Sequence, residues 1–293
     1  MSPPRLHVLI PVYGRPELLT ETLDSVKGLA RSGVPVTVVD DASPDGDVED
    51  LVAACEGIEY RRNDVNLGVA ANFNHCAELS TGDYTVLLGS DDLLLASYGD
   101  VVHRLVSTFA RPAMAMPSVR VIDAHGLPAW PLADRVKGWI APSGPERLLS
   151  GESLARRLLL GNWLYFPAIA WRTDLLRAFA FRPEQRSAMD LDVELRLVFA
   201  GHGLAWSPEV AACYRRHDQS VSSTEATDGA RFAEERAISR WAAEQATAKG
   251  WGAAARVARL RPLSRLHAAS VAIPRTLRSP AGSRALWAHV LGR

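Results

Sequence analysis

Three short, nearly continuous apolar runs mark the amino-terminal part of the chain, at residues 6–11 (LHVLIP), 34–39 (VPVTVV) and 84–88 (YTVLL). Runs of this length and composition are typical of strands that are buried on both faces. Residues 17–29 and 69–79 lie between these runs and place apolar side chains at helical spacing. Strands and helices that alternate in this way are joined by crossover connections. The pattern therefore predicts an α/β fold with a mainly parallel, mixed central sheet flanked by helices.

A similar but less regular pattern continues to about residue 222. It predicts helices at 48–55, 98–109, 152–160 and 190–200 and strands at 58–61, 113–122 and 204–214. Residues 123–151 are rich in Pro, Gly and Trp and have no clear periodicity, so we expect a long loop there. Long loops in compact domains are usually functional or mobile. This segment and residues 183–188 are therefore candidates for substrate contacts or a lid.

Composition places the chain among globular proteins with a sizeable core. Of its 293 residues, 47% are apolar and 23% are charged, and the formal net charge is zero, so no overall field favours nucleic acid. The three cysteines, Cys55, Cys76 and Cys213, are widely spaced, and an odd number of them fits reduced thiols better than a disulfide framework. The chain shows no signal-peptide pattern after Met1 and no apolar run of membrane-spanning length. We therefore expect a cytoplasmic protein.

The carboxy-terminal segment differs in composition from the rest of the chain. From about residue 224 it is rich in Ala and Arg, and no acidic residue follows Glu244. Arginines at 256, 259, 261 and 265 alternate with leucines and predict a basic amphipathic helix. Such a helix can lie on an anionic membrane surface at the inner face of the membrane, on another protein, or against its own domain with a solvated face. A homodimer is also left open by the sequence.

Two pairs of aspartates follow predicted strands. Asp40 and Asp41 end the second apolar run, and Asp91 and Asp92 come just after the third. The carboxyl ends of strands in open α/β sheets meet at the crevice that binds ligands. The first pair can be a simple turn or helix cap, or can accept hydrogen bonds from a nucleoside. The two carboxylates of the second pair repel each other unless hydrogen-bond donors or a cation offset their negative charges. A Mg²⁺ or Mn²⁺ ion held on a diphosphate explains it economically.

Two further residues are candidates for chemistry in the second half of the chain. Asp190 and Asp192 stand at the start of a predicted helix, where acids complement the helix dipole, but Asp190 can also serve as a general base. His217 follows the last predicted strand and is either a surface histidine or a ligand that completes a metal site. The aromatic residues Trp139, Trp163 and Tyr165 can stack on sugars or pack in the core.

Motifs of other nucleotide-binding and hydrolytic enzymes are missing from the sequence. No GxGxxG follows the first strand, and neither GxxxxGK[ST] nor GxSxG occurs. Dinucleotide dehydrogenases, P-loop NTPases and α/β-hydrolases are therefore disfavoured. A sugar-nucleotide-forming nucleotidyltransferase is disfavoured too, because residues 11–14 (PVYG) do not form the Gly-rich, Arg-containing loop that such an enzyme needs after its first strand.

Several segments together resemble the family-2 glycosyltransferases, inverting enzymes of the GT-A fold. They are residues 10–16 (IPVYGRP), 38–46 (VVDDASPDG), 62–68 (RNDVNLG), 87–92 (LLGSDD), 189–192 (MDLD) and 214–217 (YRRH). The resemblance covers about residues 5–222. It implies a GT-A domain at 1–222, with a nucleotide-sugar-binding half at 1–122 and an acceptor-binding half at 123–222. Residues 223–293 would then form a helical, basic extension.

The resemblance also implies a set of nucleotide-sugar-binding residues: Pro11, Tyr13, Arg15, Asp41, Arg62, Asn66, Asp91 and Asp92. The first three would line the nucleotide pocket, Asp41 would contact the base, and Arg62 and Asn66 would help to hold the nucleotide. Asp91 matches the last acid of the family's DxD motif, which binds metal and diphosphate. Asp92 and His217 would be further metal or diphosphate contacts.

Gly89 departs from the family pattern, because many members have an acid at this position. The substitution puts the ribose contact in doubt, and Asp92 can take over part of it. The implied reaction is a metal-dependent, single in-line displacement in which Asp190 deprotonates a hydroxyl of a glycan, a lipid-linked glycan or a small molecule. The alternative is a non-catalytic module of the same fold that binds a nucleotide sugar or a partner.

Overall fold

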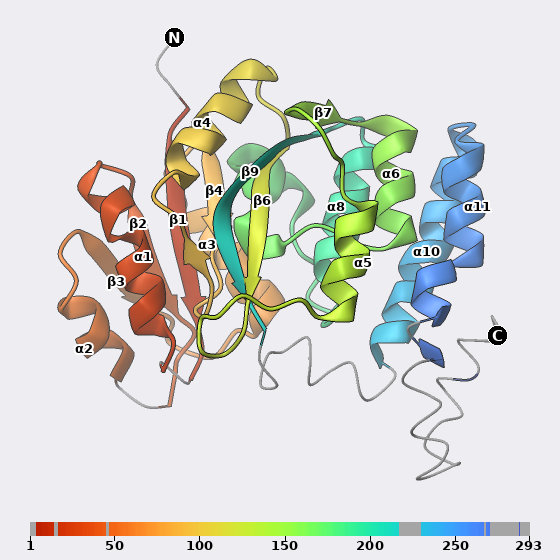
Figure 1. The fold of residues 1–293 in the computed structure, drawn as a ribbon. Helices are drawn as coiled ribbons and strands as arrows, with labels where there is room; N and C mark the ends of the chain where they lie inside the picture. Colours follow the sequence, from red (N-terminus) through yellow and green to blue (C-terminus); the bar gives the residue numbers. More distant parts are fainter. Residues whose placement is uncertain are drawn as a thin grey trace.

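A single mixed sheet organises the part of the chain that the computed structural model describes, which comprises residues 4–14, 17–44, 47–216, 230–266, 268, 269 and 287. The strand order is β3-β2-β1-β4-β8-β6-β9-β5, and β7 also pairs with β9. The strands are β1 Leu6–Val12, β2 Val36–Asp40, β3 Ile58–Arg62, β4 Tyr84–Leu87, β5 Leu93–Leu94, β6 Met114–Ile122, β7 Arg147–Leu149, β8 Ala170–Arg172 and β9 Leu204–Arg215. Helices cover both faces of this sheet (Figure 1).

The two halves of the sheet differ in strand direction. Strands β3, β2, β1 and β4 are parallel to one another, and β1 is buried along nearly all its length, as its apolar run predicts. Beyond β4, the short strand β8 is antiparallel to both of its neighbours, β6 and β9 are parallel, and β5 and β7 run antiparallel to β9. The expected α/β fold with a mixed sheet is confirmed.

Most predicted helices form within a few residues of their expected bounds. The helices are α1 Leu19–Arg31, α2 Asp47–Ala53, α3 Val69–Leu79, α4 Tyr98–Thr108, α5 Leu132–Ile140, α6 Gly151–Leu160, α7 Thr173–Phe179, α8 Met189–Phe199, α10 Ala230–Ala248 and α11 Gly252–Leu260, with a 3-10 turn η1 at Phe166–Ala168. In α1, the side chains of Leu19, Leu23 and Val26 are buried on one side, which is the amphipathic pattern that predicted the helix.

The expectation of a structureless loop at 123–151 was wrong, because the segment contains α5 and β7. Helix α5 follows the usual pattern of buried apolar and exposed polar residues only in part, because it buries Ile140 but also buries an acid and exposes two large apolar residues. Its Asp134 is buried, whereas Leu132 and Trp139 are 69% and 74% exposed. Helices are recognised in a sequence when their apolar residues recur on the side that faces the core. In α5 large apolar residues face solvent, so we did not recognise the helix. The short elements β8 and α7 were also missed.

The carboxy-terminal helices pack against the rest of the molecule. Helix α10 contacts α8, and α11 contacts both α10 and α6 (Figure 1). The ring of Phe199 on α8 lies 5.3 Å from Trp241 and 5.4 Å from Trp251, measured between centroids. The described part of this segment therefore includes a helix that packs on its own domain, one of the three arrangements considered. In the described ranges, no helix has the length and hydropathy to cross a membrane.

Candidate active site

The loops that follow β1, β2 and β3 meet at one edge of the sheet, the lower edge in Figure 1. The amide of Gly14 donates to Ser43 Oγ at 2.9 Å, and the amide of Asn63 donates to the carbonyl of Asp40 at 2.8 Å. The carboxyl ends of parallel strands share an edge, so the three loops form one surface there. This is the crevice in which the sequence predicts nucleotide binding.

Asp40 is buried beneath this surface and bonds residues of its loops. Its side chain is fully buried and accepts hydrogen bonds from the Ser43 amide at 2.8 Å, from the Tyr60 hydroxyl at 2.7 Å, and from Arg62. Burial alone would raise the pKa of Asp40, but the hydrogen bonds from these three residues outweigh it and lower the pKa. Arg62, a predicted nucleotide contact, is thus anchored by Asp40 and keeps 43% of its side chain exposed.

Asp41 is buried as well, and it organises the start of α3. One of its carboxylate oxygens accepts from the Asn63 side chain and from the Leu67 amide, both at 2.8 Å, and the other accepts from the Gly68 amide at 2.9 Å. The sequence did not identify Asn63 as a partner. The predicted contact between Asp41 and a nucleoside base stays a prediction.

The remaining predicted nucleotide contacts differ in exposure. Pro11 is half-buried, Tyr13 is 60% exposed, and Asn66 is exposed and accepts a hydrogen bond from the Gly68 amide at 2.9 Å. All three lie on strand ends or loops at the crevice edge, and their contacts to a nucleotide stay predictions. Arg15 and His217 lie outside the described residues.

Asp91 and Asp92 lie beside Gly89, just beyond β4. A Cβ atom placed on Gly89 would lie 2.5 Å from an oxygen of Asp92 and 2.9 Å from an oxygen of Asp91. Both carboxylates therefore fold over the glycine, and a side chain at this position would have to displace them. Burial, and then the negative charge of Asp91, raise the pKa of Asp92 well above its usual range. The pair is the like-charged arrangement that a cation would relieve.

Arg215, at the end of β9, supports this acidic pair, a role that we did not predict from the sequence. It is buried, with its amide donating to Asp92 at 2.8 Å and its Nε donating to the carbonyl of Asp91 at 2.8 Å. Its guanidinium also bonds Glu21 on α1 at 2.6 Å. Arg215 thus ties the acidic pair to β9 and α1, two elements far apart in the sequence.

The next residue, Arg216, connects β9 to α5. It donates two hydrogen bonds to the carboxylate of Asp134, at 3.0 and 3.1 Å, and Asp134 also accepts from the Tyr165 hydroxyl at 3.1 Å. Lys137, one turn along α5, lies 4.4 Å above the Tyr165 ring and donates to the carbonyl of Leu164 at 2.8 Å. The segment that leads to His217 is therefore fixed to α5.

Asp190 lies in the first turn of α8, as predicted, and is partly exposed. Its carboxylate accepts from the Leu191 amide at 2.8 Å and from the Asn162 side chain at 3.2 Å. Asp192, by contrast, is buried and paired with Arg182 at 3.2 Å and Arg196 at 2.7 Å, so it has a structural role. Asn162 is a second site residue that the sequence did not predict.

Two further ionisable groups surround Asp190. Glu194, one turn later on α8, is fully buried, and neither carboxyl oxygen has a hydrogen-bond partner among the described residues. Burial, and then the negative charge of Asp190, raise the pKa of Glu194 well above its usual range. Burial, and then the charge of Arg216, lower the pKa of Lys137 to about 8. The surroundings of Asp190 thus include a buried carboxyl group with a raised pKa and an amine with a lowered pKa.

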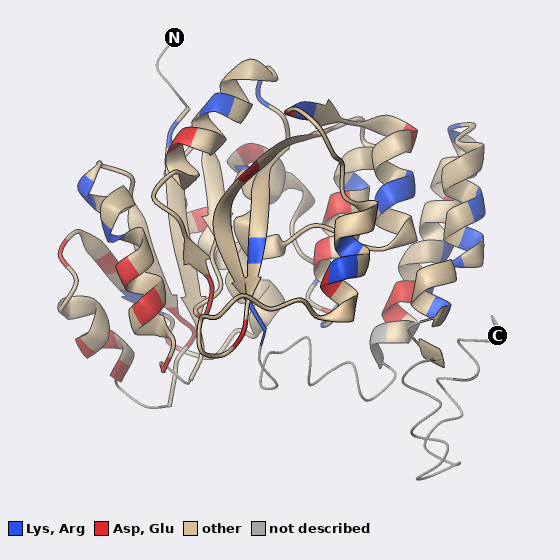
Figure 2. Cartoon of the chain, in the orientation of Figure 1, with Lys and Arg blue, Asp and Glu red and all other residues tan. Residues whose placement is uncertain are grey.

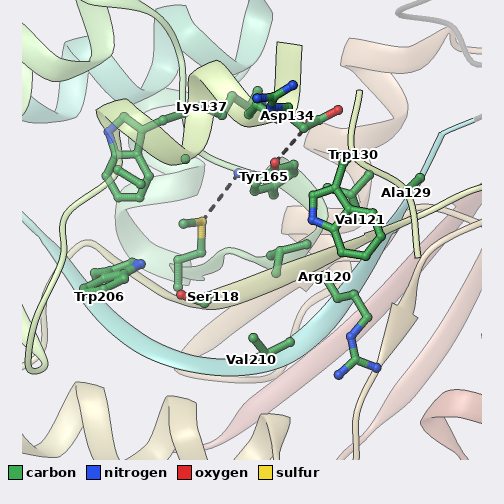
Figure 3. Close-up of a pocket in the computed structure, with 16 residues that line it drawn as sticks. Ser118, Arg120, Val121, Ala129, Trp130, Asp134, Lys137, Tyr165, Trp206 and Val210 are labelled. Carbon is green, nitrogen blue, oxygen red and sulfur yellow. Dashed lines mark hydrogen bonds between the residues drawn. The ribbon is translucent and has the colours of Figure 1, made fainter. Parts of the chain in front are cut away.

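A cavity of about 450 Å³ opens between α5 and the strands β6 and β9 (Figure 3). Its lining includes Trp130, Trp163, Tyr165, Trp206 and Lys137. Trp163 is 1% exposed, so it packs in the core while lining the cavity. Trp139 points away from the core and lies outside the lining. The aromatic residues singled out in the sequence are therefore not one stacking surface.

A comparison with known protein families decides the family of the chain. The model of the family described as glycosyl transferase family 2 matches residues 7–171. The chain belongs to glycosyl transferase family 2. The match begins in β1 and ends in β8, so it includes the acidic pairs of the crevice and stops before Asp190. The family resemblance that the sequence segments suggested is confirmed.

Curated relatives match parts of this family-2 chain. An abequosyltransferase, RfbV of Salmonella typhimurium, is 38% identical over 92 residues, which is 29% of this chain and 27% of the relative. The uncharacterized protein MT1568 of Mycobacterium tuberculosis is 28% identical over 229 residues, which is 74% of this chain and 66% of the relative. The chain therefore spans less than two thirds of the length of either relative.

Solved structures of glycosyltransferases share the fold. TarS of S. aureus (residues 1–349), in complex with UDP-GlcNAc, superposes with a TM-score of 0.64 at 15% identity, covering 94% of this chain and 73% of TarS. The mannosyltransferase PcManGT of Pyrobaculum calidifontis, in complex with GDP-Man and Mn²⁺, superposes with a TM-score of 0.59 at 16% identity, covering 99% and 87%. At these identities the likeness shows the fold, and it confirms the expected GT-A architecture.

Proposed function

We propose that this protein transfers a sugar from a nucleotide-diphospho-sugar to a hydroxyl acceptor, with a divalent metal ion and with inversion at the anomeric carbon. The observation that carries the proposal is the pair of carboxylates that converge over Gly89 at the ligand-binding edge of a family-2 fold. UDP-GlcNAc in TarS and GDP-Man in PcManGT are both nucleotide-diphospho-sugars, which supports this class of donor.

The residues at this edge fit a hard divalent cation. Mg²⁺ and Mn²⁺ bind through one or two carboxylates, and substrate phosphates supply further oxygen ligands. Asp91 is the more exposed member of the pair, so it would hold the ion, and Asp92 would support it from a buried position. No group of three or more His, Cys, Asp and Glu converges within the described ranges, and His217, a candidate third ligand, lies outside them. When bound, the ion would neutralise charge on the departing diphosphate.

Asp190 would act as the general base. It is partly exposed at the start of α8, and hydrogen bonds from Asn162 and from the Leu191 amide fix its orientation. A carboxylate held in this way can take the proton of an acceptor hydroxyl as that oxygen attacks the anomeric carbon. One attack on the face opposite the diphosphate gives a single displacement, so the configuration at that carbon inverts.

Replacing the two aspartates separately tests the proposal. Asp190→Asn removes the base, so transfer is expected to fall by about 10²–10⁴-fold while donor binding persists. Asp91→Asn is expected to remove both transfer and the effect of metal on donor binding. Product formation and anomeric configuration are followed by NMR, with Asp24→Asn on the exposed side of α1 as the control. Full activity in both variants would refute the proposal, and donor binding without any turnover in the wild type would favour the non-catalytic module.

A further inference from the structure

The cavity beside α5 (Figure 3) has a composition unlike that of the donor crevice. Its volume of about 450 Å³ lies within the range of small-molecule sites, roughly 300–1,000 Å³. Trp130, Trp163, Tyr165 and Trp206 give it aromatic walls, and the indole N–H of Trp163 has no acceptor among the described residues. A buried donor of this kind is costly unless a bound molecule supplies an acceptor. The cavity is therefore a candidate ligand site.

The cavity adjoins the proposed general base. Trp163 lines it, and the preceding residue, Asn162, donates to the carboxylate of Asp190. Lys137 also lines the cavity, and the charge of Asp190 acts on its pKa. Asp190 is not part of the lining, but the residue that orients it directly precedes a lining residue. Within the proposed function, on which this inference rests, the cavity is therefore the described pocket from which an acceptor would approach Asp190.

The charges around the cavity favour an anion. Arg120, Arg135 and Lys137 line it, and the two arginines form no ion pair with any described residue. Asp134 is the one carboxylate of the lining, and its charge is already matched by the two hydrogen bonds from Arg216. The lining thus has a net positive charge that a phosphate or diphosphate group would complement.

Exposed apolar side chains lie both at the rim of the cavity and on the outer side of α5. Trp130, at the rim, is 75% exposed, and Leu132 and Trp139 are 69% and 74% exposed. Leu132 and Trp139 are seven residues apart, so they lie on the same side of the helix, and Arg135 lies between them in the sequence. Basic residues of α5 are visible beside this surface in Figure 2. Tryptophans next to arginines are typical of protein surfaces that meet lipid.

We propose that the acceptor is a lipid-linked phosphate or diphosphate sugar. The cavity holds the anionic group and the sugar, and the outer side of α5, defined by Trp130, Leu132 and Trp139, holds the apolar chain. The two halves of such an amphiphile match the two neighbouring surfaces, cationic and apolar, and its sugar hydroxyl lies toward Asp190. A neutral, soluble glycan would leave both the arginines and the apolar surface without a partner.

Simple amphiphiles test the two halves separately. Binding of decyl phosphate, ethyl phosphate and decyl glucoside is measured by calorimetry, below the concentrations at which they form micelles. Two buried methylene groups account for roughly tenfold in affinity, so decyl phosphate is expected to bind at least tenfold more tightly than ethyl phosphate. It is also expected to bind more tightly than decyl glucoside, which has the same chain and no charge.

Matched variants assign each preference to its surface. The double variant Leu132→Ser with Trp139→Ser is expected to lose the preference for the longer chain, and Leu148→Ser, at a 45% exposed leucine on β7, is expected to keep it. Arg120→Gln with Arg135→Gln is expected to lose the preference for phosphate over glucoside, and Arg5→Gln, at an exposed arginine before β1, is expected to keep it.

Each other outcome overturns the proposal. Equal affinity for ethyl and decyl phosphate would indicate a soluble anionic acceptor. Equal affinity for decyl glucoside and decyl phosphate would refute the anionic site, and the absence of binding would refute both sites. These variants leave the donor crevice intact, so each is expected to keep the rise in melting temperature that nucleotide sugars give in the wild type. This measurement tests the donor site independently of amphiphile binding. A protein that binds decyl phosphate as expected but no nucleotide sugar would contradict the proposed function and not the amphiphile site.

Discussion

At the scale of single residues, Gly89 explains how the acidic pair can lack the usual first acid of its motif. The carboxylates of Asp91 and Asp92 occupy the space where a side chain at this position would stand. The glycine is therefore part of the geometry of the pair, and an acid added there would displace the two that are present. The sequence showed the departure, and the structure shows that the two carboxylates take the space beside the glycine.

Gly89→Ala is expected to weaken metal-dependent nucleotide-sugar binding by about tenfold or more, because a new Cβ atom cannot sit 2.5 Å from a carboxylate oxygen without displacing it. Calorimetry with and without Mn²⁺ measures the effect. Gly28→Ala on α1 is the control, since nothing lies within 4 Å of its added Cβ. Unchanged metal-dependent affinity in Gly89→Ala would show that the pair does not hold the ion.

Glu194 gives the stability of the protein a distinct pH dependence. Its pKa is raised in the folded state, so between the unfolded and folded pKa values the folded protein retains a proton that the unfolded chain has lost. Stability therefore falls as pH rises through that window. Glu194→Gln removes this titration, and its melting temperature is expected to exceed that of the wild type by more at pH 8 than at pH 5. An equal difference at both pH values would show that Glu194 titrates normally.

Sequence reasoning at this scale found residues that stand at the ends of strands or the start of a helix. Asp91 and Asp190 were singled out in this way, and the structure has them just beyond β4 and in the first turn of α8, while their roles stay predictions. Arg215, Asn162 and Glu194 were not, because each acquires its role from partners in elements distant in the sequence, or from burial alone. A buried arginine looks the same in a sequence as an exposed one.

At the scale of elements, a glutamate of α10 holds the segment that leads into α8. Glu234 accepts hydrogen bonds from the amides of Arg186, Ser187 and Ala188 at 3.0, 2.9 and 3.1 Å. A carboxylate at this place satisfies amide groups near a helix start and complements the helix dipole. Asp190 follows within two residues, so its position depends on a helix from the carboxy-terminal segment.

Glu234→Ala is expected to lower kcat by roughly 10–100-fold, because small displacements of a catalytic group have effects of this size, and to leave donor KM nearly unchanged. Glu234→Gln retains one acceptor oxygen, so its kcat is expected to lie between those of the wild type and Glu234→Ala. Steady-state kinetics provide the measurement, and Glu244→Ala, at an exposed position of the same helix, is the control. A rise in donor KM with kcat unchanged would contradict this positioning role.

Helix α5 shows why some elements escaped sequence reasoning. Hydrophobic periodicity finds the side of a helix that faces the core, and in α5 that side carries Asp134 while leucine and tryptophan face outward. By contrast, β1 and α4 were predicted closely because both bury their apolar residues in the ordinary way. The elements that depart from the usual pattern are those around the proposed acceptor site.

At the scale of the whole molecule, the carboxy-terminal helices belong to the same packed body as the sheet. Apolar residues of α10 and α11, among them Ile238, Ala242 and Ala254, join the buried core that contains β1. Glu152 of α6 also accepts from the amides of Ala253 and Ala254, at 2.7 and 3.1 Å, at the start of α11. The sequence showed only a change in composition after residue 224, because an alanine-rich helix looks alike whether it packs or lies free.

The central claim is that a divalent ion on the Asp91 pair holds a nucleotide-diphospho-sugar. It is tested most directly by thermal unfolding of the wild type, Asp91→Asn and Asp190→Asn with UDP-, dTDP-, CDP- and GDP-linked sugars, each with and without Mn²⁺. A ligand that binds the folded state raises the melting temperature. We predict that at least one of these donors gives a Mn²⁺-dependent rise in the wild type and in Asp190→Asn, and none in Asp91→Asn. No Mn²⁺-dependent rise with any donor in the wild type, or an equal rise in Asp91→Asn, would contradict the account.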